Sequence, residues 1–263
     1  MMITAGCDVG SLTSKAVVMR GNRIIGTAII RSRTHPEKTA RQVMDQALKM
    51  AGVDEKDVAH SVGTGYGVEK IAFVTARHSE IACHARGARF LVPTARTVID
   101  IGGQDCKASR LDENGGVLKF LANDKCAAGT GRFLEVMAKI LNLSLDELGK
   151  LSKIARAPVT LASTCTVWAQ ADVIQYLNSG ETVADVGAGV NNAMASRVAS
   201  LANGVGVTAD VCMTGGVAKN QGVVHALEKL LNERIVIPRK ADPQLAGAVG
   251  AAILAREIAE GSK

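Results

Sequence analysis

The sequence is poor in aromatic residues: four Phe, two Tyr and one Trp make up 3% of its 263 residues. Proteins that bind single-stranded nucleic acid stack bases on such side chains, so the scarcity disfavours that class. No run approaches about 18 consecutive apolar residues, and we therefore expect no membrane-spanning helix. The chain opens without a basic segment followed by an apolar one, so we expect no signal peptide and a cytoplasmic location.

Several common catalytic motifs are also absent. The sequence has no G-x-x-x-x-G-K-S/T, which excludes a P-loop nucleotide site. G-x-S-x-G and H-E-x-x-H are missing, and the five histidines fall at no zinc-like spacing. Gly63–Gly67 is glycine-rich without matching the dinucleotide fingerprint, and we expect a turn there.

The charge balance is mildly basic, with 31 Lys and Arg against 25 Asp and Glu and a net charge of +6. The basic residues are scattered, which argues against a DNA-binding arm. An ordinary surface explains this balance, and so does a ligand that carries negative charge, such as nucleotide phosphates.

Strands alternate with helices along the chain, which is the pattern of an α/β protein. With 47% hydrophobic residues, the composition is that of a globular chain. We expect strands at 3–10, 15–20, 24–31, 58–64, 97–102, 106–111, 117–121, 210–214 and 235–237. We expect helices at 36–51, 79–91, 130–141, 145–151, 167–177, 182–201, 218–231 and 245–258.

The pattern of strands restarts near the middle of the chain. Asp8-Val9-Gly10 is followed by Lys15-Ala16, and Asp100-Ile101-Gly102 is followed by Lys107-Ala108 at an offset of 92 residues. The same order of strand, loop, strand and turn surrounds both copies, which predicts two lobes of one plan. Each lobe would present an aspartate at the end of its first strand, facing the other lobe.

We place the boundary between the lobes at residue 92. The first lobe comprises residues 1–92, and the C-terminal helix 243–262 packs back on it. Residues 93–242 form the second lobe and carry the candidate metal-binding cysteines. No linker rich in Pro, Gly or Ser separates the lobes, which favours close packing around a cleft.

The turn after the first strand, Asp8–Lys15, suits a phosphate. Glycine allows a tight turn, and the amides and hydroxyls that follow can point at phosphate oxygens. Asp8 is placed to hold Mg²⁺ through water, because magnesium binds few carboxylates and keeps waters. A polar hairpin turn explains the stretch equally well. The candidate nucleotide contacts in this turn are Gly10, Ser11, Thr13 and Lys15.

Asp100–Asp105 repeats this argument in the second half. Asp100 can share the metal, and Gln104 or Asp105 can orient an attacking water, so we take these three and Asp8 as candidate catalytic residues. A third glycine turn, Met213–Asn220, follows a strand and opens a helix, where a phosphate can meet a helix N-terminus. The further candidate nucleotide contacts are Gly102, Gly103, Gly215, Gly216, Lys219, Asn220 and Gln244.

The six cysteines divide into two groups. In a reducing compartment they are packing residues, metal ligands or catalytic groups rather than disulfides. Cys126 precedes small residues and a helix, so we expect it at a helix N-terminus, where amides favour a thiolate. Cys165 lies in a polar loop before another helix, and since neither belongs to a local C-x-x-C, spacing alone favours packing for both. The other four lie in apolar strands or on a helix and are expected to be buried: Cys7, Cys83, Cys106 and Cys212.

Four segments resemble the acetate/sugar-kinase, heat-shock chaperone and actin superfamily of ATPases. They are Asp8–Lys15, Asp100–Asp105, Met213–Asn220 and Leu245–Ala252. The resemblance implies an α/β fold of two duplicated ribonuclease-H-like lobes, with a nucleotide in the cleft between them.

Other segments are similar to a narrower family, the iron–sulfur ATPases that activate 2-hydroxyacyl-CoA dehydratases or form the ATPase subunits of benzoyl-CoA reductases. These segments are Thr64–Gly67, Val98–Asp105, Asn123–Leu134 and Ser163–Val167. The resemblance covers essentially the whole chain. It implies a protein that binds ATP or ADP with Mg²⁺ and passes a single low-potential electron from reduced ferredoxin or flavodoxin to a dehydratase.

The same resemblance implies one [4Fe–4S] cluster that bridges a homodimer, with Cys126 and Cys165 of each chain as ligands. Such a cluster takes four thiolates, and one chain offers two good ones. Trp168, Gln170 and Val68 depart from the residues typical of the family, which bears on the identity of the partner enzyme.

Three alternatives stay open on the sequence. The chain can be an ATPase subunit held permanently in a benzoyl-CoA-type reductase. It can be a small-molecule kinase of the same superfamily, or an ATP-gated interaction protein without a redox role. Iron would be absent from the last two.

Overall fold

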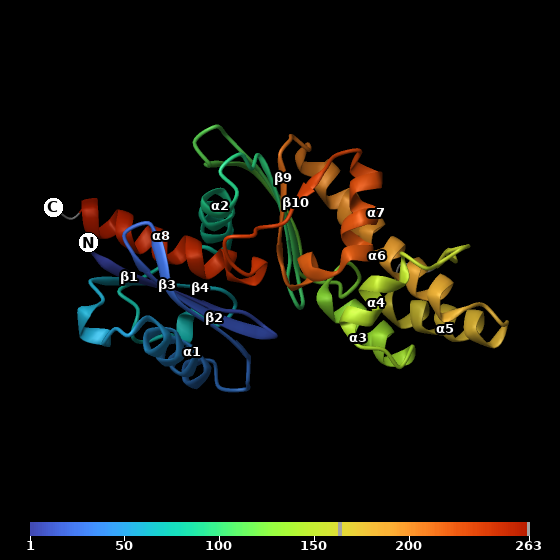
Figure 1. The fold of residues 1–263 in the computed structure, drawn as a ribbon, viewed down its shortest axis with the longest axis horizontal. Helices are drawn as coiled ribbons and strands as arrows, with labels where there is room; N and C mark the ends of the chain where they lie inside the picture. Colours follow the sequence, from blue (N-terminus) through green and yellow to red (C-terminus); the bar gives the residue numbers. More distant parts are fainter. Residues whose placement is uncertain (163–164, 262–263) are drawn as a thin grey trace. The chain divides into compact units, whose positions relative to one another are not determined.

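The computed structural model describes residues 1–162 and 165–261, and these residues form two compact units. Each unit contains one five-stranded sheet covered by helices (Figure 1). Within the described ranges, no helix combines the length and the apolar character that crossing a bilayer requires. The first unit consists of Met1–Arg96, Leu111–Leu118 and Pro238–Lys263, and the second of Thr97–Arg110 and Lys119–Ile237.

The sheet of the first unit is an antiparallel meander of three strands to which two parallel strands are added. Side chains alternate between its faces, as strand geometry requires. In β2, Ala16 and Val18 belong to the core formed with helix α1, whereas Val17 and Met19 pack with helix α8. The strand order is β3-β2-β1-β4-β5, with β1 at Ile3–Val9, β2 at Thr13–Arg20, β3 at Arg23–Arg31, β4 at His60–Thr64 and β5 at Ala76–Arg77.

Local sequence signals fix the helices of this unit. Pro36 occupies the first turn of α1, where no amide hydrogen bond is needed, and Gly52 ends the helix in the left-handed region with a φ of 62°. Helix α8 lies directly on β1, because a Cβ atom at Gly6 would be 2.0 Å from the carbonyl oxygen of Ala248. The helices are α1 at Pro36–Ala51, α2 at Glu80–Leu91 and α8 at Ala246–Gly261.

The second unit has one large apolar core between its sheet and five helices. Ile99 and Ile101 of β6 face this core, together with Met194 of α6. The strands are β6 at Thr97–Ile101, β7 at Cys106–Leu111, β8 at Val117–Asn123, β9 at Val211–Gly215 and β10 at Ile235–Val236. The helices are α3 at Gly131–Ile140, α4 at Leu145–Leu151, α5 at Thr166–Asn178, α6 at Val183–Val205 and α7 at Gln221–Leu231.

Both sheets have the same strand order, because β8-β7-β6-β9-β10 repeats β3-β2-β1-β4-β5. In each sheet the first strand pairs antiparallel with the second and parallel with the fourth. Asp8 lies opposite Lys15, and Asp100 lies opposite Lys107. The α/β class and the repeat predicted from the sequence are therefore confirmed.

Several element boundaries differ from the expected ones by a few residues, and some elements differ altogether. The strand β5 was not expected, since two residues are too short to carry an alternating pattern. The expected helix at 218–231 is divided into a 3₁₀ turn at Gly216–Lys219 and the helix α7, with Asn220 as the N-cap between them. Asparagine favours this position because its side chain can accept a hydrogen bond from the first helical turn.

Candidate functional site

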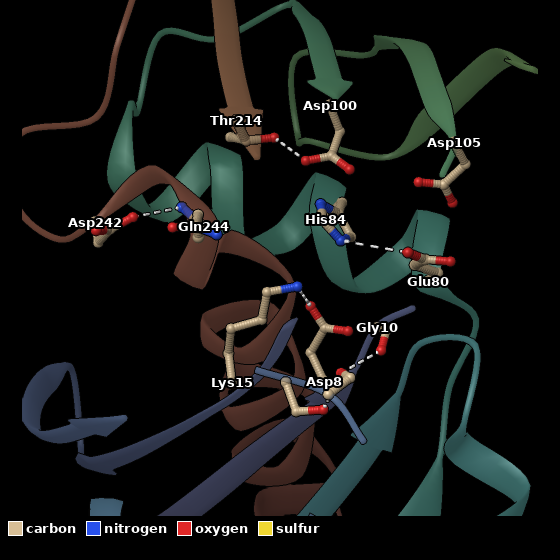
Figure 2. A network of polar contacts seen from close by, with 12 residues as sticks. Asp8, Gly10, Lys15, Glu80, His84, Asp100, Asp105, Thr214, Asp242 and Gln244 are labelled. Carbon is tan, nitrogen blue, oxygen red and sulfur yellow. Dashed lines mark hydrogen bonds and ion pairs between the residues drawn. The ribbon is translucent and has the colours of Figure 1, made fainter. Parts of the chain in front are cut away.

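The first acidic turn is centred on Asp8, near the end of β1. Its side chain is buried, and the Nζ atom of Lys15 on the neighbouring strand donates to Oδ2 at 3.2 Å (Figure 2). A buried carboxylate needs such a partner, because desolvation of an unpaired charge is costly. Oδ1 is buried as well and has no hydrogen-bond partner among the described residues. This oxygen is available to a water or a metal ion.

The loop after Asp8 is held by hydroxyl groups. The Ser32 hydroxyl donates to the carbonyl oxygen of Gly10 at 2.6 Å, and the hydroxyls of Ser32 and Ser14 share a hydrogen bond of 2.9 Å. Ser11 and Thr13 are half-buried in the same loop. The conformation of this loop thus depends on Ser14 and Ser32, neither of which the sequence singled out as a nucleotide contact.

The second acidic turn places Asp100 near the end of β6. The Thr214 hydroxyl of β9 donates to Oδ1 of Asp100 at 2.7 Å (Figure 2). Lys107, opposite Asp100 in the register, forms an ion pair with Asp105. Gln104, between Asp100 and Asp105 in the turn, is exposed.

Each aspartate has a Thr-Gly pair beside it on the parallel strand. Thr64 lies opposite Asp8 and Thr214 lies opposite Asp100, and each is followed by a glycine. Gly65 and Gly215 have φ values of 91° and 84°, which favour glycine. A Cβ atom at Gly65 would be 2.5 Å from Oδ1 of Asp8. The sequence comparison missed this Thr-Gly correspondence, because the parallel strands stand at different distances along the two repeats.

The third glycine turn connects β9 to α7. Gly216 and Lys219 are exposed in it. The Asn220 side chain is buried, its Oδ1 accepts from the Val223 amide at 2.9 Å, and its Nδ2 donates to Oδ1 of Asn191 at 3.1 Å. These bonds give Asn220 a structural task in helix α7, whatever else it contacts.

Gln244 lies in a short 3₁₀ turn, Pro243–Leu245, that leads into α8. Its backbone amide donates to Oδ1 of Asp242 at 2.9 Å (Figure 2). Asp242 thereby caps the turn and fixes the backbone position of Gln244.

Four of the six cysteines are buried, as the sequence predicts. Cys126 and Cys165 are exposed, and the other four are buried free thiols. Burial raises the pKa of Cys83 and Cys212 to about 12, and it raises the pKa of Cys7 and Cys106 further still. Those four thiols stay protonated at neutral pH and are poor metal ligands.

Cys126 lies in a loop that is braced from within. The side-chain amide of Asn123 donates to the carbonyl oxygens of Cys126 and Ala128 at 3.0 and 2.9 Å. The N-cap of the next helix is Thr130, whose hydroxyl donates to the Ala127 carbonyl at 2.7 Å. Our expectation of Cys126 at a helix N-terminus is therefore wrong: a turn through Gly129, with a φ of 85°, comes between them.

The N-terminus of α3 is bonded to the second glycine turn. The Gly131 amide donates to the Gly102 carbonyl at 2.9 Å, and the Arg132 amide donates to the Gly103 carbonyl at 2.8 Å. These two bonds satisfy amides that a helix cannot pair internally. They join the turn beside Asp100 to the helix that follows the Cys126 loop.

Cys165 is the N-cap residue of α5. Its neighbours Ser163 and Thr164, part of the cysteine motif in the sequence, lie outside the described residues. Upstream, the amides of Arg156 and Ala157 donate to Oδ1 of Asp185 at 2.8 and 2.7 Å. Asp185 thus ties the segment that leads to Cys165 onto helix α6.

Comparison with known proteins identifies the family of this chain. Residues 5–255 match the BadF/BadG/BcrA/BcrD ATPase family. The chain belongs to this family.

The relatives of this ATPase match along nearly its whole length. The activator of lactoyl-CoA dehydratase from Anaerotignum propionicum is 46% identical over 260 residues, which are 98% of this chain and 99% of the relative. A benzoyl-CoA reductase subunit from Thauera aromatica is 36% identical over 262 residues, 96% of this chain and 93% of the relative.

Solved structures confirm the fold. The activator of 2-hydroxyisocaproyl-CoA dehydratase from Clostridium difficile, solved with bound ADPNP, has a TM-score of 0.94 at 43% identity and covers 99% of this chain and 97% of its own. A ROK-family glucokinase from Streptomyces griseus has a TM-score of 0.62 at 15% identity and covers 97% of this chain and 99% of its own. The glucokinase shows a shared fold only, and this fold is the sugar-kinase type that the sequence predicts.

Removal of the Asp185 carboxylate should lower the thermal stability of this ATPase in a pH-dependent way. The Thr182 hydroxyl and the Ala157 and Arg156 amides hold the pKa of Asp185 below its ordinary value of 3.8. Its stabilising effect is therefore complete above that pH and is lost as the pH falls through the lower pKa of the folded state. Asp185→Ala should lower the melting temperature by several degrees at pH 7, and the difference from wild type should shrink below about pH 3.8.

Calorimetric melting from pH 7 down to pH 3 measures this difference. Asp146→Ala is the matched control, because that carboxylate is exposed on α4 and pairs with Lys150 one turn away. An Asp185→Ala protein that melts like the Asp146→Ala protein at pH 7 contradicts the anchoring role.

Proposed function

We propose that this ATPase activates a 2-hydroxyacyl-CoA dehydratase by coupling ATP hydrolysis to the delivery of a single low-potential electron. The observation that carries the proposal is the pair of hydrogen bonds from α3 to Gly102 and Gly103, because they connect a candidate phosphate turn to the Cys126 loop. The 46% identity to an activator over almost the full chain supports the same role.

We propose that the two acidic turns bind and hydrolyse ATP. Asp8 fits a magnesium site, since its Oδ1 is buried, has no hydrogen-bond partner among the described residues and borders a glycine. Hard oxygen ligands of this kind suit Mg²⁺, which keeps most of its waters. Asp100 is the second carboxylate for the metal, and Gln104 and Asp105 are the residues that we expect to orient the attacking water.

The remaining candidate contacts supply hydrogen bonds and positive charge to the nucleotide. Backbone amides in glycine turns can approach phosphates closely. The proposed nucleotide contacts are Gly10, Ser11, Thr13, Lys15, Gly102, Gly103, Gly215, Gly216, Lys219, Asn220 and Gln244. Asn220 contributes through the turn it shapes, since its side chain already caps α7.

Cys126 and Cys165 are the residues that would hold an iron–sulfur cluster. Both thiols are exposed and lie in the same unit, and thiolates are the ligands that such clusters take. When bound, a [4Fe–4S] cluster supplies a one-electron redox centre. In the part of the chain that the structure describes, no three His, Cys, Asp or Glu side chains form a metal site. Two chains of a homodimer would together provide the four thiolates.

The partners follow from this division of tasks. We propose reduced ferredoxin or flavodoxin as the electron donor and the dehydratase as the acceptor, where the acyl-CoA chemistry takes place. The cytoplasm suits this role, because its reducing conditions keep cysteine ligands available. The lower identity to the benzoyl-CoA reductase subunit, 36% against 46%, makes a permanent place in a reductase complex the second choice.

The cysteine assignment predicts the metal content of variants. Protein purified without oxygen should contain four iron and four sulfide per two chains, because the cluster needs the thiolates of both. Cys126→Ala and Cys165→Ala should each abolish iron binding, whereas Cys83→Ala should retain it, since that thiol is buried and protonated. Iron and sulfide analysis with visible absorbance measures this. A Cys126→Ala protein with full iron content overturns the assignment.

The aspartate assignment predicts a separate loss. Asp8→Asn and Asp100→Asn should each reduce ATP hydrolysis by roughly 100-fold, the usual effect of removing one group that stabilises transition-state charge. Both variants should keep the cluster absorbance. Asp146→Asn, which removes an exposed carboxylate, should hydrolyse ATP at the wild-type rate. Bleached protein in either variant would mean that the aspartates have structural roles instead.

A further inference from the structure

A buried histidine, His84, lies beside Asp8 and has no part in the proposed function. His84 lies on α2, in the first unit, and is 7% exposed. It is one of five histidines in the chain, and no metal-binding spacing singled it out in the sequence. Its surroundings, however, are not those of a packing residue.

A glycine in the first turn of α8 brings His84 and Asp8 to one small space. A Cβ atom at Gly247 would be 2.7 Å from Nε2 of His84 and 2.8 Å from Oδ2 of Asp8. Both polar atoms therefore border the same point, and any larger residue at position 247 would meet both. All three residues belong to the first unit, so the arrangement is internal to it.

Charged groups complete this cluster on both sides. Oε1 of Glu80, one helical turn before His84, is 3.9 Å from Nε2 of the imidazole ring (Figure 2). Lys15 approaches Oδ2 of Asp8 at 3.2 Å. The order Glu80, His84, Asp8, Lys15 thus alternates acidic and basic side chains across α2, β1 and β2.

The two oxygens of Asp8 are used differently. Oδ2 faces Lys15 and the space that it shares with His84, whereas Oδ1 borders Gly65 and has no hydrogen-bond partner among the described residues. A carboxylate fixed through one oxygen presents the other in a defined direction. Groups that hold a ligand to a metal in this way commonly change metal affinity by about 10–100-fold when removed.

We propose that His84 is a positioning residue for Asp8: it holds the carboxylate so that Oδ1 stays available to hydrated Mg²⁺, and Glu80 orients the imidazole ring. This inference rests on the proposed ATPase function and adds to it a second layer around the metal ligand. In this proposal His84 and Glu80 affect nucleotide binding through Asp8 and the metal ion, without touching the nucleotide.

The test measures Mg²⁺-dependent nucleotide binding, without turnover, in purified holoprotein. A fluorescent ADP analogue is titrated at a series of Mg²⁺ concentrations and again with a chelator present. His84→Ala should raise the Mg²⁺ concentration needed for half-maximal binding by about tenfold, within the range for groups that orient metal ligands. Affinity for the analogue in chelator should stay at the wild-type value, because the proposed role of His84 is to position Asp8 and not to contact the nucleotide.

Two conservative variants separate positioning from packing. His84→Gln keeps a hydrogen-bonding group on a side chain of similar length and should recover most of the Mg²⁺ response. Glu80→Gln should give a smaller shift in the same direction. Arg86→Ala is the control: it removes an ion pair between α2 and α8, to Glu257, on an exposed part of both helices, and it should bind like wild type.

Each result decides the inference. If His84→Ala fails to fold, as judged by thermal melting, His84→Leu, which fills a similar volume without a hydrogen-bonding group, takes its place. A Mg²⁺ response of the folded His84→Ala or His84→Leu protein that equals that of Arg86→Ala overturns the role of His84 and leaves the proposed function intact. A wild-type protein that binds no Mg²⁺-nucleotide at all overturns the proposed function, and this inference with it.

Discussion

Two backbone hydrogen bonds in the second unit connect the glycine turn beside Asp100 to the start of the helix that follows the Cys126 loop. The first amides of α3 donate to the carbonyls of Gly102 and Gly103, so the helix start and the glycine turn cannot shift independently. The Cys126 loop is continuous with that helix start through Gly129 and Thr130. Under the proposed function, a change that a bound phosphate causes in this turn would therefore reach the loop that carries Cys126.

The rest of the architecture can be understood as support for such turns. Two sheets of identical strand order each end their first strand in an aspartate, and each places a Thr-Gly pair beside it. Asp8 forms an ion pair with Lys15, and Asp100 accepts a hydrogen bond from Thr214. A duplicated frame thus places an aspartate, a lysine and a Thr-Gly pair at corresponding positions.

Much of this could be predicted from the sequence, because strand pairs close in the chain carry their own signals. The offset of 92 residues correctly aligned Asp8 with Asp100 and Lys15 with Lys107, since hairpin registers follow from short loops. The parallel strands β4 and β9 escaped that comparison, because the insertions before them differ in length. Thr64 and Thr214 were matched only by the register of the folded sheets.

The burial of the candidate site residues could be predicted in part. Apolar neighbours in the sequence sorted the buried cysteines from the exposed ones, and exposure confirms the division. The error at Cys126 arose because a glycine turn and a threonine cap delay the helix, which spacing does not reveal. His84 was missed for another reason: its neighbours Asp8 and Gly247 are far away along the chain, and only folding brings them together.

Hydrogen exchange followed by mass spectrometry tests the central link most directly. The anaerobic holoprotein is compared with ADP and with a non-hydrolysable ATP analogue, and peptides spanning residues 98–105 and 123–134 are followed. We predict that both peptides change protection together between the two nucleotides, because the α3 amides are bonded to the glycine turn. A change confined to residues 98–105, with the cysteine loop and the start of α3 unaffected, would contradict the account.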